Sequence, residues 1–136
     1  MNAQILYATM TGHSRKIANA IAQKTGLPVH DLAAQPRIPD CDLLFIVSGI
    51  YGGECKPELL AHAQQIKAKR VVLITSSTRG IAQGGLRATL TRAGLTVDAR
   101  EYQCKGSFLF AAMGHPNRVE LNEAAEFAAK MVKDAQ

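Results

Sequence analysis

The chain has 136 residues, of which 47% are hydrophobic and 20% charged, and this composition fits one globular domain over residues 1–136 and excludes a disordered or fibrous protein. The net charge is +5, but the basic residues are dispersed and not interleaved with aromatic residues, so we expect no nucleic-acid binding. The chain has no apolar run of the ~20 residues that cross a bilayer and no signal-peptide pattern, and its cysteines are odd in number and widely spaced. We therefore expect a cytoplasmic protein that binds neither membranes nor metal ions.

The first part of the chain predicts a strand, a helix and a second strand. An apolar run at 5–8 is followed by a turn at 9–14 and by a helix, which ends near Thr25 and has apolar residues at helical spacing. Gly26 stands where a C-terminal helix cap belongs. A weaker strand is predicted at 29–32. Alternation of short strands with helices is typical of an α/β fold with a parallel sheet.

The rest of the chain continues this alternation with three strands and three helices. The runs at 43–47 and 71–75 predict buried strands that helices cover on both faces, and a helix begins between them near Pro57. A third helix precedes a strand at 97–100, whose alternation of polar and apolar residues indicates a sheet edge. The last helix is predicted to begin at Asn117.

The turn after the first strand carries three hydroxyl side chains around a glycine. It lies where open α/β sheets bind ligands, and hydroxyl and backbone N–H donors at a helix N-terminus suit the dianion of a phosphate monoester. The turn matches neither the nucleoside-triphosphate nor the dinucleotide fingerprint. We predict a phosphate-binding turn, and the alternative is a simple helix cap. The residues of the turn are Thr9, Met10, Thr11, Gly12, His13 and Ser14.

Residues 5–18 resemble the phosphate-binding signature of flavodoxins, because two apolar residues, an aromatic residue, Thr-x-Thr-Gly and a closing alanine fall in register. Ser14 replaces the threonine that is usual in the family and keeps the hydroxyl. The order of strands and loops is similar to that of short-chain flavodoxins over essentially the whole chain. The resemblance implies a flavodoxin-like three-layer α/β sandwich, with a five-stranded parallel sheet in the order 2-1-3-4-5 and helices on both faces. It also implies FMN at the switch point between strands 1 and 3.

Two further loops hold the flavin ring in flavodoxins. The first loop is expected over 48–54, where Tyr51 would cover one ring face. Gly52 matches the glycine whose peptide group forms a hydrogen bond with flavin N5, and Glu54 resembles the acid at the pyrimidine edge. The second loop has no aromatic residue, and Arg79 is the nearest replacement. The alternatives are a plain turn with a half-exposed tyrosine and an arginine that points into water. The resemblance assigns Gly49, Ile50, Tyr51, Gly52, Gly53 and Glu54 to the first loop, and Ser76, Ser77, Thr78, Arg79 and Gly80 to the second.

The function that the resemblance implies is an FMN-binding carrier of single electrons between redox partner proteins. Flavodoxins are usually strongly acidic, and because this chain is basic we expect partners with acidic docking surfaces. We expect a monomer or a weak dimer.

Two alternative functions stay open. An FMN-dependent NAD(P)H:flavin or quinone oxidoreductase would oxidise NAD(P)H by itself, although the chain has short loops and no nicotinamide fingerprint. A flavin-free interaction module is favoured by the missing aromatic of the second loop, and such a protein would be colourless when purified.

Overall fold

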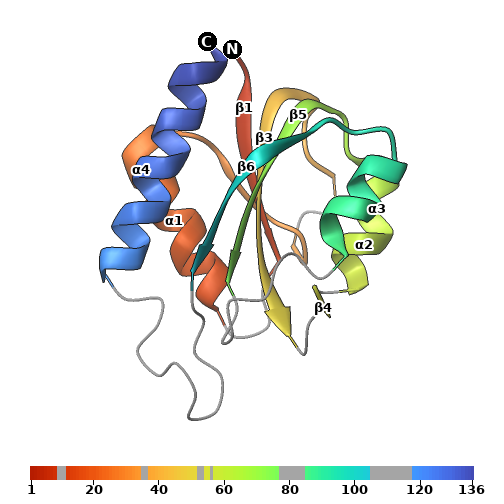
Figure 1. Ribbon diagram of the computed structural model, residues 1–136, viewed down its shortest axis with the longest axis horizontal. Coiled ribbons are helices and arrows are strands. Elements are labelled where there is room, and N and C mark those ends of the chain that lie inside the picture. The colour runs from red at the N-terminus through yellow and green to blue at the C-terminus, as the bar shows by residue number, and fades with distance from the viewer. Residues whose placement is uncertain (9–11, 35–36, 52–53, 56, 77–84, 105–117) are drawn as a thin grey trace.

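Five parallel strands form the central sheet of the computed structural model, in the order β2-β1-β3-β5-β6 (Figure 1). The structure describes residues 1–8, 12–34, 37–51, 54–55, 57–76, 85–104 and 118–136, with 50–51, 54–55 and 104 described by their backbone. Counted along the chain, the parallel strands have the predicted order 2-1-3-4-5, which confirms the flavodoxin-like sheet. The strands are β1 (Ala3–Ala8), β2 (Val29–Asp31), β3 (Cys41–Tyr51), β4 (Glu54–Cys55), β5 (Ala68–Ser76) and β6 (Val97–Cys104).

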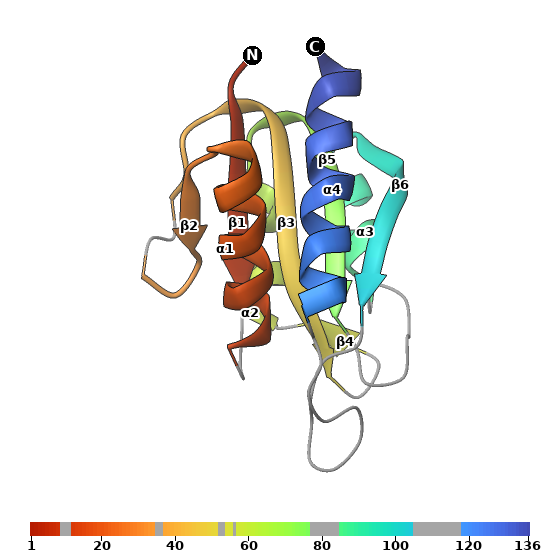
Figure 2. The ribbon, with the colours of Figure 1, turned by 90° about the vertical axis from the view of Figure 1, so that its left-hand side faces the viewer.

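Helices cover both faces of this sheet, as predicted. The four helices of the described residues are α1 (His13–Thr25), α2 (Pro57–His62), which continues into a 3₁₀ turn at Ala63–Gln65, α3 (Leu86–Arg92) and α4 (Arg118–Ala135). Figure 2 shows α1 and α4 side by side in front of the sheet, and Figure 1 shows α2 and α3 on its other side. The structure therefore has three layers.

The two cores follow from the alternation of side chains along the strands, since successive residues of a strand point to opposite faces. In β1, Ile5 packs toward α1 and α4, whereas Leu6 packs toward α2 and α3. The core under α1 and α4 includes Ile17, Ile21, Phe45, Val72, Ile74, Ala124 and Met131, and the core under α2 and α3 includes Leu44, Ile46, Leu59, Leu73, Leu86 and Leu90. Two buried faces explain why the central strands are apolar throughout.

Local sequence signals place the C-terminal end of α1 correctly, whereas the helix begins at His13, inside the turn predicted at 9–14. The helix ends at Thr25, and Gly26 has a left-handed backbone (φ 73°) from which its N–H donates to Ala22 O at 2.7 Å. A glycine adopts this conformation without the steric cost of a side chain. The predicted C-terminal cap is therefore confirmed.

The predicted loop over 48–54 is wrong in part. β3 continues to Tyr51 and pairs with the antiparallel strand β4, with Ile50 opposite Cys55 and Tyr51 opposite Glu54. This pairing provides main-chain partners for residues beyond the end of the apolar run, and no hydrophobic pattern marks it.

Other boundaries also differ from the prediction. β6 runs to Cys104 rather than to residue 100, because it pairs with β5 up to the partners Ser76 and Cys104. β2 ends at Asp31, one residue before the predicted end. The predicted start of the last helix, Asn117, lies outside the described residues.

Candidate functional site

The carboxyl ends of β1, β3 and β5 meet at one edge of the sheet, which is the lower edge in Figure 1. There Ala8 is the partner of Ser48, and Gly49 is the partner of Ser76. Because only four residues separate the end of β1 from the start of α1 at His13, the N-terminus of α1 lies at this edge as well. We call it the carboxyl edge.

Eight predicted site residues belong to the described part of the chain, and nine do not. The structure brings Gly49 and Ser76 together as strand partners, and Tyr51 and Glu54 as partners in the hairpin of β3 and β4. The other described residues are Gly12, His13, Ser14 and Ile50. Those outside the described residues are Thr9, Met10, Thr11, Gly52, Gly53, Ser77, Thr78, Arg79 and Gly80.

The N-terminus of α1 has a glycine at the capping position. Gly12 has a left-handed backbone (φ 88°), and its carbonyl accepts the first helical hydrogen bond, from Lys16 N at 3.2 Å. A Cβ built at Gly12 meets nothing within 4 Å, so the backbone angle and not crowding requires glycine here. Because glycine has no side chain, it cannot cap the first N–H groups of the helix as serine or aspartate would.

The charges in the first turn of α1 oppose the helix dipole. This turn has no acidic residue and instead carries His13, Arg15 and Lys16, whereas α2 and α4 have Glu58 and Glu120 in their first turns. A cation at a helix N-terminus is disfavoured by roughly 0.3–1 kcal/mol. Burial, and then the charge of Lys16, lower the pKa of His13, which favours its neutral form. The end of α1 is thus suited to an anion from outside the chain.

A buried hydroxyl completes this arrangement. Ser14, in the first turn of α1, is 0% exposed, and its Oγ has no hydrogen-bond partner among the described residues. An unsatisfied buried polar group costs about 1–3 kcal/mol, and native proteins keep few of them. An anion such as a phosphate monoester at the end of α1 would accept a hydrogen bond from this hydroxyl. The residues present therefore fit a phosphate group.

Two further hydroxyls lie at the same edge, on the face that α2 and α3 cover. Ser48 and Thr75 are partners at the ends of β3 and β5. Ser48 Oγ donates to Gly49 O at 3.1 Å, whereas Thr75 Oγ1, on a residue that is 1% exposed, is without a partner in the described structure. Sequence reasoning did not assign these two residues to the site. A polar residue at the end of each of two neighbouring apolar runs was the available signal.

Arg15 connects three elements beside the predicted phosphate-binding turn. Its Nε donates to the hydroxyl of Tyr7 in β1 at 3.2 Å, and its guanidinium carbon lies 6.0 Å from the centroid of the Tyr7 ring. One of its terminal nitrogens lies 3.9 Å from the carboxylate of Asp31 in β2. No local signal in the sequence predicts that Tyr7 and Asp31 contact Arg15, because the strands that carry them pair only in the folded chain.

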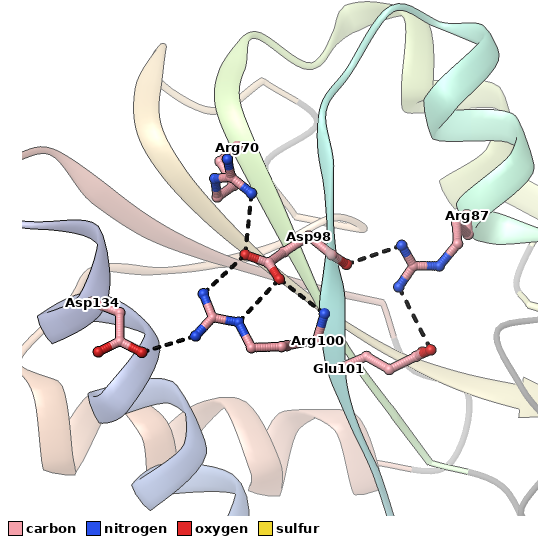
Figure 3. Close-up of polar contacts among 6 residues, drawn as sticks. All are labelled: Arg70, Arg87, Asp98, Arg100, Glu101 and Asp134. Carbon is pink, nitrogen blue, oxygen red and sulfur yellow. Dashed lines mark hydrogen bonds and ion pairs between the residues drawn. The ribbon is translucent and has the colours of Figure 1, made fainter.

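The opposite edge, where the parallel strands begin and where the chain ends lie, has a network of polar groups that are paired with one another (Figures 1 and 3). We call it the amino edge. The side chain of Asp98 is 7% exposed; its Oδ1 accepts from Arg100 N at 2.9 Å and Arg100 Nε at 3.2 Å, and its Oδ2 accepts from Arg70 at 3.1 Å and Arg100 Nη2 at 3.3 Å. Burial alone would raise the pKa of Asp98, but the hydrogen bonds from Arg100 and the charges of Arg100 and Arg70 outweigh it and lower that pKa.

The same network links β6 to two helices. Arg100 donates to Asp134 of α4 at 2.8 Å, and Arg87 of α3 donates to the carbonyl of Asp98 at 2.9 Å. Arg87 Nη2 forms no hydrogen bond within the described structure but lies 3.5 Å from the Glu101 carboxylate as an ion pair. These contacts connect an edge strand to the helices on both faces of the sheet (Figure 3).

A cavity of about 690 Å³ lies beside this network. Every charged side chain in its wall is already in an ion pair: Asp42 with Lys69, Asp98 with Arg70 and Arg100, and Asp134 with Arg100. The cavity thus offers a ligand no unpaired side-chain charge. At the carboxyl edge, by contrast, buried hydroxyls have no partner among the described residues. We therefore place the candidate site at the carboxyl edge.

The described residues contain no group of three or more His, Cys, Asp or Glu residues that would hold a metal ion. They also contain no helix with the length and apolar character that a membrane span requires.

Comparisons with known proteins agree with this architecture. The family model of the flavodoxin domain matches residues 4–100, and comparison with curated proteins gives no match. Among solved structures, a flavodoxin from the domain Archaea has a TM-score of 0.72 at 14% identity, with 99% of both chains covered. General stress protein 14 of Treponema denticola, in complex with FMN, has a TM-score of 0.63 at 16% identity, with 100% of both chains covered.

The fold also occurs as part of a longer protein. Rubredoxin oxygen:oxidoreductase from Desulfovibrio gigas has a TM-score of 0.75 at 16% identity, with 98% of this chain and 36% of that chain covered. This chain therefore spans about a third of that protein's length. The likenesses to solved structures show the fold, and the match of the family model over most of the sequence shows that the chain belongs to the flavodoxin family.

Proposed function

We propose that this protein binds FMN at the carboxyl edge and carries single electrons between redox proteins. The observation that carries the proposal is the buried and unpartnered hydroxyl of Ser14, within the described structure, at a helix N-terminus that has no acidic residue. Membership of the flavodoxin family supports it, as does the FMN complex of the similar Treponema denticola protein.

In this proposal the described residues hold and orient the cofactor. Ser14 Oγ donates a hydrogen bond to a phosphate oxygen, and the dipole of α1 favours the negative charge. The hairpin of β3 and β4, which contains Tyr51 and Glu54, lies at the ring. Bound FMN supplies the one-electron chemistry, and the protein excludes water and sets the charge around it. Arg79 and the other predicted site residues outside the described structure remain predictions.

The partners follow from charge. Because the net charge is +5, we propose redox partners with acidic docking surfaces, whose association would weaken as salt is added. We propose that the chain acts in the cytoplasm as a single domain, as a monomer or weak dimer.

The test is a titration of the flavin-free protein with FMN, followed by quenching of flavin fluorescence. We expect the wild type to bind FMN and Ser14→Ala to bind it about 10- to 100-fold more weakly, because a charge-assisted hydrogen bond contributes about 1.5–3 kcal/mol. Thr25→Ala is the matched control, since it removes a hydroxyl from the other end of α1, where Thr25 donates to Ile21 O at 2.7 Å. Its affinity should equal that of the wild type.

Two results would overturn the proposal. If the wild-type protein took up no FMN, the proposed cofactor would be wrong, and a flavin-free interaction module would replace the electron carrier as the proposed function. An FMN-loaded protein that oxidises NAD(P)H without a partner would instead be a reductase.

A further inference from the structure

Arg15 stands where an unpaired positive charge costs most within α1. It lies in the first turn of the helix, next to Ser14, and no acidic side chain shares that turn. Its side chain is 57% exposed, and among the described side chains it forms one ion pair, with a carboxylate oxygen of Asp31 that is 3.9 Å away. An exposed ion pair of this kind contributes little, so Asp31 does not offset the unfavourable position.

The guanidinium is nonetheless held in one place. Tyr7, which is buried, accepts the hydrogen bond from Arg15 Nε at 3.2 Å, and the ring lies 6.0 Å from the guanidinium carbon. Tyr7 precedes the predicted phosphate-binding turn at 9–14 and Arg15 follows it, so the contact joins the chain on the two sides of that turn. One helical turn rises only ~5.4 Å along the axis, which keeps this charge close to the end of α1.

We propose that Arg15 is a selectivity residue for the anionic tail of the ligand: its charge favours dianionic phosphate esters over uncharged analogues, and Asp31 limits that preference. This inference rests on the proposed function and adds to it. A phosphate monoester carries a charge of about −1.5 to −2 at pH 7. The phosphate of FMN interacts with both the positive charge of Arg15 and the negative charge of Asp31. Riboflavin has the same ring and no phosphate, so neither charge affects its binding strongly.

The two side chains therefore have opposite effects on the same equilibrium. Removing the charge of Arg15 weakens the binding of FMN, and removing the charge of Asp31 strengthens it. Asp31→Asn keeps the oxygen that accepts the hydrogen bond from Ala33 N at 3.0 Å, so the local turn is preserved. Damage to the structure alone would weaken binding in both variants, so the signs separate the proposal from a structural effect.

The experiment measures the dissociation constants of FMN and riboflavin for the wild type, Arg15→Gln, Asp31→Asn and Lys24→Gln. We expect Arg15→Gln to bind FMN about tenfold more weakly and riboflavin within about twofold of the wild type. Asp31→Asn should bind FMN about two- to threefold more tightly. Lys24→Gln removes an equal charge at the far end of α1, where Lys24 pairs with Glu126 at 3.1 Å, and should match the wild type.

A second readout is the salt dependence of FMN affinity between low and physiological ionic strength. The slope should be smaller for Arg15→Gln than for the wild type, because one screened attraction has been removed. Equal losses of FMN and riboflavin affinity in Arg15→Gln, or no loss of either, would overturn the inference while FMN binding by the wild type kept the proposed function. A wild type that binds neither flavin would overturn both.

Discussion

The two edges of the sheet treat their polar groups in opposite ways. At the amino edge, the two carboxylate oxygens of Asp98 each accept two hydrogen bonds, from Arg70 and Arg100. At the carboxyl edge, the hydroxyls of Ser14 and Thr75 are buried, and the described residues offer them no partner. An unpaired buried polar group lowers stability, whereas a paired one does not. The pairing at the amino edge therefore indicates a structural role, and the unpaired hydroxyls at the carboxyl edge indicate a functional one. The amino edge stabilises the chain, whereas the unpartnered hydroxyls of the carboxyl edge support the ligand site that we propose there.

The largest expected effect breaks the network at the amino edge. Asp98→Ala should lower the free energy of unfolding by about 1.5–3 kcal/mol, because it removes the buried acceptor of the hydrogen bonds from Arg70 and Arg100. Urea unfolding measures this loss. Asp42→Ala, which removes a carboxylate from the more exposed pair with Lys69, should lower stability far less, because a solvent-exposed ion pair contributes little. FMN affinity should be unchanged in both variants, and a weaker affinity would contradict the separation of the two edges.

A smaller effect with the opposite sign is expected at the carboxyl edge. Ser14→Ala and Thr75→Val should each raise the free energy of unfolding of the flavin-free protein by about 1 kcal/mol, because each removes a buried hydroxyl that lacks a partner. Thermal unfolding without FMN measures the gain. Thr25→Ala is again the control and should lower stability, since the Thr25 hydroxyl donates to Ile21 O and accepts from Leu27 N. If Ser14→Ala were less stable than the wild type, the hydroxyl would have a structural partner.

The smallest effect is the response of the amino edge to acid. The pKa of Asp98 in the folded chain lies below its ordinary value of 3.8, so this group stabilises the fold above that value and the contribution disappears as the pH falls through the lowered pKa. The stability difference between the wild type and Asp98→Asn should therefore be constant from pH 7 to about 5 and narrow below about 4. Urea unfolding at several pH values measures the difference, and a gap that stays constant down to pH 3 would contradict the assignment.

Some features of the fold could be predicted because their causes are local. The apolar run of Leu43–Val47 indicates a strand buried on both faces, and Gly26 marks the end of α1 by a conformation that glycine adopts at low cost. The antiparallel pairing of β3 with β4 could not be predicted in the same way. It depends on hydrogen bonds across the strands, which leave no periodic trace in the residues that make them.

The candidate site could likewise be predicted only in part. Ser14 was predicted to face a phosphate because it follows a strand and a glycine in a family-like turn, and the structure adds that its hydroxyl is buried without a partner in the described residues. The contacts of Arg15 with Tyr7 and Asp31 were not predicted. They join a helix to two strands, and the choice of partner depends on how those elements pack.

The sequence by itself determined the order of the parallel strands and the helices and the hydroxyl-rich turn, because hydrophobic periodicity, caps and motifs act within short windows of the chain. Only the tertiary structure decided which polar side chains pair and which do not. Arg70 and Asp98 are 28 residues apart, and Arg100 and Asp134 are 34 apart. Burial makes the pairing of polar groups important for stability, and these groups become buried only once the layers have packed against one another.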